Sequence, residues 1–133
     1  MWAGSQSRGA VPKDARGAND ALGRRGEDLA ARHLAGDGYE LLARNWRCSA
    51  GEIDIVASDG DVLVVVEVKT RTSTTFGTPA DAITRRKASK LRELALTWLS
   101  EHPGAGRAVR FDVVGVLLPR NGPVRLEHLR GVL

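Results

Sequence analysis

The chain of 133 residues suits one hydrophobic core and is too short for two, because a typical domain takes roughly 100 to 150 residues. It holds 20 Lys and Arg against 16 Asp and Glu, which gives a net charge of +4 and an isoelectric point of about 9.8. This excess favours polyanionic partners, and the single cysteine, Cys48, excludes a disulfide framework or a multi-cysteine metal cluster.

No segment has the apolar length that export or membrane insertion requires. A secretory signal needs an apolar run of roughly 7 to 15 residues near the N-terminus, and a membrane span needs about 20. The sequence contains neither. We therefore expect a soluble cytoplasmic protein without membrane contact, and a reducing compartment also suits the lone cysteine.

Residues 1–19 are rich in Gly, Ala and Ser without apolar periodicity, which predicts a disordered tail before a single domain over residues 20–133. Asp20 is a suitable N-cap for a helix that runs to about Ala35 and is ended by a Gly-Asp-Gly segment. A first strand is predicted over residues 39–47.

Two runs rich in β-branched residues follow, at 51–57 and 61–71, and a Ser-Asp-Gly segment between them predicts a tight hairpin turn. The second run is apolar on both faces, which is typical of a central strand covered by helices on each side. Thr78 and Pro79 predict the start of a long helix that ends near Ser100. Buried and short edge strands are predicted at 110–119 and 124–129, which completes an α/β pattern.

Carboxylates gather where the central strand turns from apolar to ionic. A turn centred on the Asp-Gly pair at 59–60 would place Glu52 opposite Glu67, and Asp54 opposite Val65. Clustered carboxylates raise each other's pKa unless a cation lies between them, and hard oxygen ligands select Mg²⁺ or Mn²⁺. We therefore predict these three acids as ligands of one divalent ion.

Lys69, two residues after Glu67, is predicted as the catalytic lysine, because a lysine beside such an ion can orient water or stabilise a phosphoryl transition state. The alternative is a surface ion pair between Glu67 and Lys69. Glu27 and Lys87 each lie within the apolar stripe of a predicted helix and join the catalytic candidates, with Glu27 also a metal ligand. The competing interpretations are that Glu27 accepts hydrogen bonds from neighbouring amides and that Lys87 snorkels to solvent.

Basic residues concentrate between Lys69 and Arg92, where the chain carries seven of them against one acid. The candidates for phosphate contact are Arg71, Arg85, Arg86 and Lys90, and a solvated helix face is the alternative for those on the helix. Six aromatic residues provide little stacking surface for single strands, so we expect recognition through phosphates and affinity that falls with salt.

Two further sets of polar residues are interpreted as structural. Asp112 is expected to pair with an arginine, such as Arg110 or Arg71. A zinc site is not indicated, because no metal-ligand spacing relates the three histidines, His33, His102 and His128, to one another or to Cys48.

The succession GRRGEDLAARHL, ARNWR, GEIDIVA, VVVEVKTR, ITRRKASKL and RFDVV resembles the YraN family of small bacterial proteins of uncertain function. The match runs from about Gly23 to Val116. Members of that family look like the restriction-endonuclease superfamily and are similar to archaeal Holliday-junction resolvases. The resemblance implies a restriction-endonuclease-like three-layer fold, in which helices flank a central mixed β-sheet.

Carried over to this chain, the superfamily's PD-(D/E)xK motif implies Asp54 and Glu67 as metal ligands, Lys69 as the catalytic lysine and Glu27 as the first-helix acid. Ile53 stands where the literal motif has Pro. We therefore expect a Mg²⁺- or Mn²⁺-dependent endonuclease acting on DNA, including branched or structured DNA.

Two alternatives remain at this stage. One is a nucleic-acid-binding scaffold without strong catalysis, and the other is a nuclease acting on RNA, since nothing in the sequence reads the 2′-hydroxyl. A homodimer would supply the two active sites that symmetric cutting of both strands needs, but no sequence feature demonstrates an interface, so the oligomeric state is left open.

Overall fold

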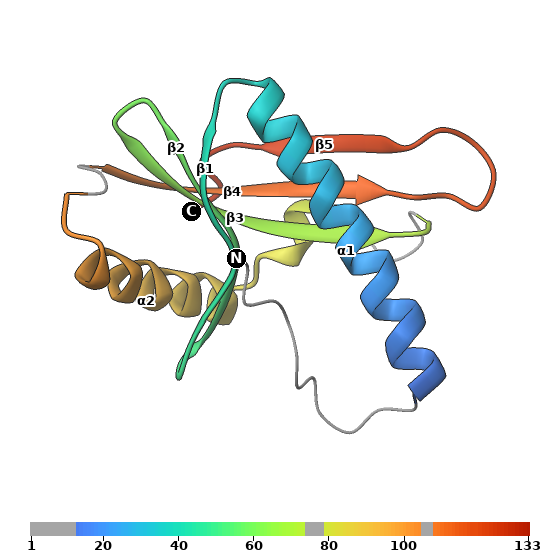
Figure 1. Ribbon diagram of the computed structural model, residues 1–133, viewed down its shortest axis with the longest axis horizontal. Coiled ribbons are helices and arrows are strands. Elements are labelled where there is room, and N and C mark those ends of the chain that lie inside the picture. Colours follow the sequence, from blue (N-terminus) through green and yellow to red (C-terminus); the bar gives the residue numbers. More distant parts are fainter. Residues whose placement is uncertain (1–12, 74–78, 105–107) are drawn as a thin grey trace.

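The structure is a computed structural model that describes residues 13–73, 79–104 and 108–133 (Figure 1). The elements in chain order are α1 (Lys13–Gly36), β1 (Glu40–Cys48), β2 (Gly51–Asp59), β3 (Val62–Arg71), the 3₁₀ helix η1 (Pro79–Ala82), α2 (Arg85–Glu101), β4 (Ala108–Leu117) and β5 (Arg125–Leu129). The predicted strands are confirmed to within two residues at each end.

The five strands form one mixed sheet in the order β1-β2-β3-β4-β5. The pair β3–β4 is parallel, because η1 and α2 carry the chain back between these strands, whereas the other three pairs are antiparallel. The predictions of an α/β fold, of β3 as the central strand and of β5 as an edge strand are confirmed.

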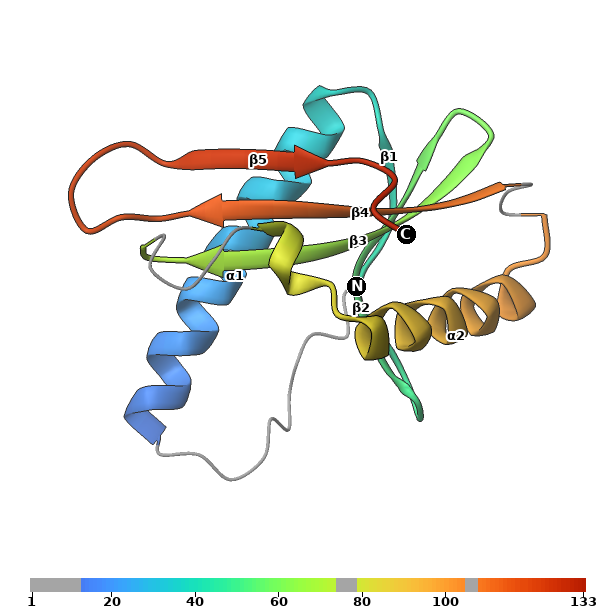
Figure 2. The same cartoon turned by 180° about the vertical axis from the view of Figure 1, so that it is seen from behind.

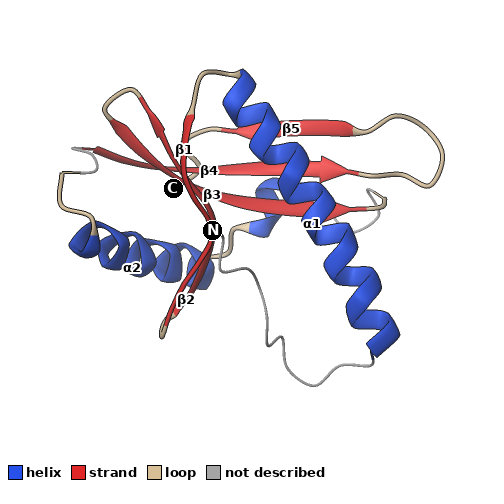
Figure 3. Ribbon diagram, in the orientation of Figure 1, coloured by secondary structure: helices blue, strands red, loops and turns tan. Residues whose placement is uncertain are grey.

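The two helices pack against opposite faces of the sheet (Figures 2 and 3). Alternate side chains of β3 enter two separate cores, since successive residues of a strand point to opposite faces. Val64 and Val66 pack in the core that includes α1, and Leu63 and Val65 pack in the core that includes α2. The apolar pattern on both faces of β3 therefore predicted its central position in the sheet correctly.

The turn between β2 and β3 differs from the prediction in register. Asp59 pairs with Val62, so the two-residue loop begins at Gly60 and not at Asp59. Gly60 has a φ of 63°, as a type II′ turn requires of its first loop residue, and only glycine takes that conformation without strain. The glycine thus decides where the hairpin turns.

The predicted pairs Glu52–Glu67 and Asp54–Val65 are consequently wrong, because Val65 lies opposite Val56. The register differs by two residues, and an even shift leaves each side chain on its expected face. It also moves Asp54 toward Glu67 along the hairpin.

The helix α2 begins at Arg85, not at Pro79, which belongs to η1. Thr84 is the N-cap, and its hydroxyl accepts a hydrogen bond from the backbone N–H of Lys87 at 3.1 Å. The predicted cap Thr78 lies outside the described residues. The predicted C-terminus is confirmed to within one residue, since α2 ends at Glu101.

The helix α1 begins at Lys13, well before the predicted cap at Asp20. Residues 13–19 contain no proline, and extending an existing helix is easier than starting one. The remainder of the expected disordered tail, residues 1–12, lies outside the described residues. Neither helix of the described chain is long and apolar enough to cross a lipid bilayer.

Candidate functional site

The strands β2 and β3 separate partway along the hairpin. Their pairing runs from Asp59–Val62 to Ile55–Val66, after which β2 continues beside β1 alone (Figure 1). Asp54 comes immediately before the last paired residue of β2, and Glu67 comes immediately after that of β3. Both acids therefore stand at the opening of the fork.

The carboxylate of Asp54 bridges this fork. Its Oδ2 accepts a hydrogen bond from the backbone N–H of Val68 at 2.8 Å. Val68 lies beyond the last residue of β3 that pairs with β2, so the Asp54 side chain takes the place of a backbone acceptor there. The contact ties the position of the acid to the backbone of the central strand.

A cavity of about 350 Å³ opens at the fork. It is lined by residues of α1, β2 and β3, namely Leu22, Gly23, Glu27, Asp54, Glu67, Val68, Lys69 and Thr70. Four predicted site residues, Glu27, Asp54, Glu67 and Lys69, thus share one cavity. Glu27 and Lys69, 42 residues apart in the sequence, meet there because α1 packs against β3.

The electrostatics of the cavity suit a cation. Burial raises the pKa of Asp54 well above its ordinary value, and repulsion from the Glu67 carboxylate raises it further, with smaller contributions from Glu27 and Glu52. The hydrogen bond from the Val68 amide opposes the rise without cancelling it. Converging carboxylate oxygens of this kind are the donors that Mg²⁺ and Mn²⁺ prefer, so these residues fit the predicted metal.

Glu67 also has a partner on α2, which covers the face of the sheet opposite to α1. Lys87 of α2 places its Nζ 2.5 Å from Glu67 Oε2, and the Glu67 side chain is 13% exposed. The predicted orientation of Lys87 toward the sheet is confirmed. Within the described chain the salt bridge of Glu67 runs to Lys87 and not to Lys69, so the simple surface pair between Glu67 and Lys69 is wrong.

Glu27 is positioned by a residue that the sequence analysis missed. Asn45 of β1 donates a hydrogen bond from Nδ2 to Glu27 Oε1 at 2.9 Å, and Arg44 Nη2 lies 3.9 Å from the same oxygen. The ARNWR motif marked this segment, but local sequence offered no sign of which side chain would reach α1.

Glu52 is not among the residues that line the cavity. Its Oε1 lies 3.3 Å from Arg47 Nη2, across the β1–β2 hairpin. The prediction of Glu52 as a metal ligand is therefore not supported by its position, because β2 pairs with β3 only as far as Ile55 and Glu52 lies beyond that point, beside β1. Its charge still contributes to the raised pKa of Asp54.

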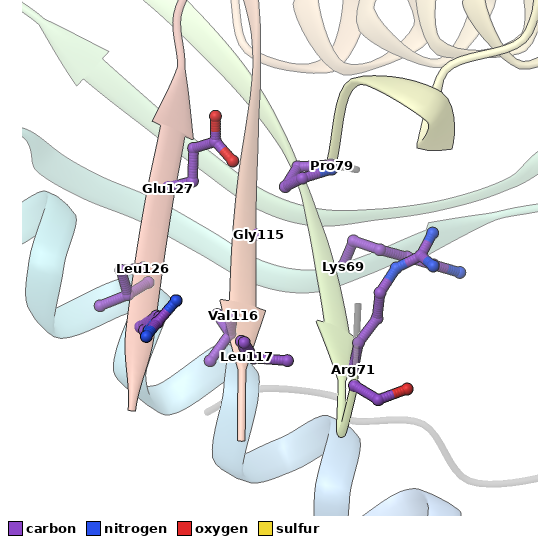
Figure 4. A pocket seen from close by; sticks show the side chains of 10 residues that line it. Lys69, Arg71, Pro79, Gly115, Val116, Leu117, Leu126 and Glu127 are labelled. Atoms are coloured by element: carbon purple, nitrogen blue, oxygen red, sulfur yellow. The ribbon is translucent and has the colours of Figure 1, made fainter. Parts of the chain in front are cut away.

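A second cavity, of about 390 Å³, lies between β3, β4, β5 and η1 (Figure 4). Lys69 and Arg71, which lie on the same face of β3, line it together with Arg125 of β5. Lys69 therefore borders both cavities. The other predicted phosphate contacts, Arg85, Arg86 and Lys90, are exposed on α2 and line neither cavity.

Asp112 has the structural pairing that was predicted. Its buried carboxylate accepts hydrogen bonds from Arg110 Nε at 3.0 Å, His128 Nε2 at 2.8 Å and the backbone N–H of Gly131 at 3.1 Å. Burial by itself raises the pKa of Asp112, but these bonds outweigh it and hold the pKa below its ordinary value. Asp112 is thus occupied away from the first cavity.

Comparison with known proteins gives a family but no activity. The family model described as "Uncharacterised protein family UPF0102" matches residues 26–116, a range that includes Glu27, Asp54, Glu67, Lys69 and Lys87. A UPF0102 protein of Frankia casuarinae is 59% identical over 86% of this chain and 97% of its own length. A UPF0102 protein of Beutenbergia cavernae is 56% identical over 86% and 98%, and one of Streptomyces coelicolor is 56% identical over 93% and 95%.

Proposed function

Because this chain belongs to the uncharacterised protein family UPF0102, whose name assigns no activity, we propose a function from its own site. We propose a Mg²⁺- or Mn²⁺-dependent endonuclease of the cytoplasm that hydrolyses phosphodiester bonds of DNA. The observation that carries the proposal is the meeting of Glu27, Asp54, Glu67 and Lys69 in one cavity at a strand fork.

Three carboxylates of the cavity would hold the metal, namely Asp54, Glu67 and Glu27. When bound, such an ion lowers the pKa of a coordinated water and neutralises charge on a phosphoryl oxygen. The raised pKa of Asp54 supports this assignment, because a cation would relieve the repulsion between the acids.

The lysines have separate roles in this proposal. Lys69 borders the acidic cavity with its ammonium available to orient the attacking water and to stabilise charge on the phosphate. Lys87 contacts Glu67 Oε2 and positions that carboxylate from the α2 side. Lys87 is therefore a positioning residue, whereas Lys69 is the catalytic one.

The second cavity supports a polyanionic substrate. Its three basic residues, Lys69, Arg71 and Arg125, outnumber its one acid, Glu127, and this excess of positive charge beside the acidic cavity suits phosphates on either side of a scissile bond. The order of helices and strands, with a forked hairpin that carries the acids, is consistent with a restriction-endonuclease-like fold. We include branched DNA among the proposed substrates because the sequence resembles resolvases.

A cleavage assay tests the proposal. Purified protein is incubated with linear duplex, single-stranded, flap and four-way-junction DNA in Mg²⁺, Mn²⁺ or EDTA. We expect metal-dependent cleavage that falls by at least about 100-fold in Glu67→Gln and Lys69→Ala, the scale seen when a stabilising group of a transition state is removed. Glu101→Gln makes the same chemical change at an exposed position of α2 and should leave the rate unchanged.

Two results would replace the proposal by its alternatives. Binding of these DNAs without cleavage, unchanged in Glu67→Gln, favours a nucleic-acid-binding scaffold. Metal-dependent cleavage confined to RNA substrates assigns an RNA-directed nuclease. Calorimetric titration of Mg²⁺ into the wild type and into Asp54→Asn reports on the metal site independently of any substrate.

A further inference from the structure

A second polar cluster lies apart from the two cavities, where the C-terminal end of α1 meets β5. His33, Asp37 and His128 each offer a ligand atom, and these atoms lie within 4.8 Å of one another. The two histidines are 95 residues apart in sequence, so no ligand spacing could reveal the pair. Sequence spacing predicted no zinc site, whereas the fold brings His33 and His128 together.

His128 is held in one orientation by a buried acid. Its Nε2 lies 2.8 Å from Asp112 Oδ2, and the Asp112 side chain is fully buried. A carboxylate accepts the hydrogen bond, so the proton of the neutral ring belongs on Nε2 and the lone pair on Nδ1. Histidine ligands of metals are commonly fixed by a carboxylate on their other nitrogen in this way.

His33 presents the second nitrogen at nearly the required distance. Its Nε2 lies 3.1 Å from His128 Nδ1, with the two rings at 80° to each other. A tetrahedral ion with metal–nitrogen bonds of about 2.0 to 2.1 Å would separate two such nitrogens by about 3.4 Å. The observed separation of the two nitrogens is therefore within a few tenths of an ångström of that value, and ion binding would turn the rings toward the ion and place the His33 proton on Nδ1.

Asp37 supplies an oxygen from the same side of α1 as His33. Its backbone N–H donates to the carbonyl of His33 at 3.0 Å, which continues the helical turn and places the two side chains one turn apart. The present partner of its carboxylate is Arg130, whose side chain is 50% exposed. Such exposed pairs contribute little free energy, so an ion can displace the arginine easily.

From this geometry we propose that His33, His128 and Asp37 form a zinc site that joins the end of α1 to β5. Two imidazole nitrogens and one carboxylate oxygen suit Zn²⁺, and the set leaves a fourth position for water. The site does not depend on the proposed nuclease activity. A bound ion would join the end of α1, the helix that also carries Glu27, to β5.

Zinc binding to the metal-free, tag-free protein tests the proposal. Isothermal titration with Zn²⁺ is carried out in excess Mg²⁺ and on the Glu67→Gln background, so that the acidic cavity does not contribute. We expect one ion per chain, at least tenfold weaker binding in His33→Ala and in Asp37→Asn, and a rise in the unfolding temperature with Zn²⁺ that both variants lose. Co²⁺ should show the visible absorption of a tetrahedral site.

His102→Ala is the matched control, because His102 stacks on Trp98 at the end of α2, away from the cluster. Its Zn²⁺ affinity should equal that of the wild type. Failure of the folded wild type to bind Zn²⁺, or binding that His33→Ala leaves intact, would overturn the proposal and assign the pair to an ordinary hydrogen bond. Neither result bears on DNA cleavage in Mg²⁺, so the two proposals fail separately.

Discussion

Asn45 shows how one residue of a strand can serve the cavity through its backbone conformation. Its φ of 52° is the only positive φ among the non-glycine residues that the structure describes. Asn tolerates this left-handed region better than most residues do, because its short side chain forms local hydrogen bonds. In this position the side chain donates to Glu27.

Two substitutions separate the backbone role of Asn45 from its hydrogen bond. Asn45→Gly retains the left-handed conformation and loses the donor, whereas Asn45→Ala loses the donor and strains the backbone by about 1 kcal/mol. We therefore expect Ala to reduce the free energy of unfolding more than Gly does, as measured by urea denaturation. Equal stability of the two variants would show that the conformation carries no strain.

At the scale of elements, the contact between α1 and β3 decides whether the acids meet. Gly26 is buried at this contact, and a Cβ built there would lie 1.9 Å from Thr70 Oγ1 and 2.9 Å from Thr70 Cβ. Rotation of the Thr70 side chain does not relieve the clash, because it leaves Thr70 Cβ in place at 2.9 Å. Only glycine allows α1 to lie this close to β3, with Glu27 as the next residue.

Substitution of Gly26 by Ala should force the helix and strand apart. We expect Gly26→Ala to lower the free energy of unfolding by about 1 to 3 kcal/mol, the usual range for an overpacked contact. Gly23→Ala, in the same helix with nothing within 4 Å of its Cβ, should instead raise stability by up to about 1 kcal/mol. Urea unfolding measures both, and a Gly26→Ala variant as stable as Gly23→Ala would contradict the close contact.

At the scale of the whole molecule, the network around Asp112 connects the C-terminal segment with the residue before β1. The carboxylate receives hydrogen bonds from Arg110 of β4, His128 of β5 and the backbone of Gly131. Tyr39, which precedes β1, donates from its hydroxyl to Asp112 Oδ2 at 3.4 Å and accepts hydrogen bonds from Arg110 and Arg130. The network therefore fixes the C-terminal segment against the start of the sheet.

Removing the charge should destabilise the entire fold. We expect Asp112→Asn to lower the free energy of unfolding by about 3 kcal/mol at pH 7, because Arg110 loses its buried partner. The folded pKa of Asp112 lies below the ordinary 3.8, so its contribution is complete above that value and is lost as the pH falls through the folded pKa. Denaturation at pH 7 and below pH 3.8 tests this, and a pH-independent difference between variant and wild type would contradict it.

The sequence by itself determined the features that depend on local pattern. The double-faced apolar run predicted β3 as the central strand, and the cluster of Asp54, Glu67 and Lys69 was visible because these residues occupy one hairpin. Period-two alternation and turn composition are properties of short segments, so they can be interpreted without the rest of the chain. The sequence also predicted an arginine partner for Asp112 and left Arg110 and Arg71 as candidates, of which the structure shows Arg110.

Only the tertiary structure decided which distant side chains meet. The choice between Asp59 and Gly60 as the first turn residue set the register, and the separation of β2 from β3 after Ile55 excluded Glu52 from the cavity. Asn45 reaches Glu27, and His33 reaches His128, because helix and strand pack at close range. Such contacts depend on how elements approach one another in space, and sequence separation carries no information about that distance.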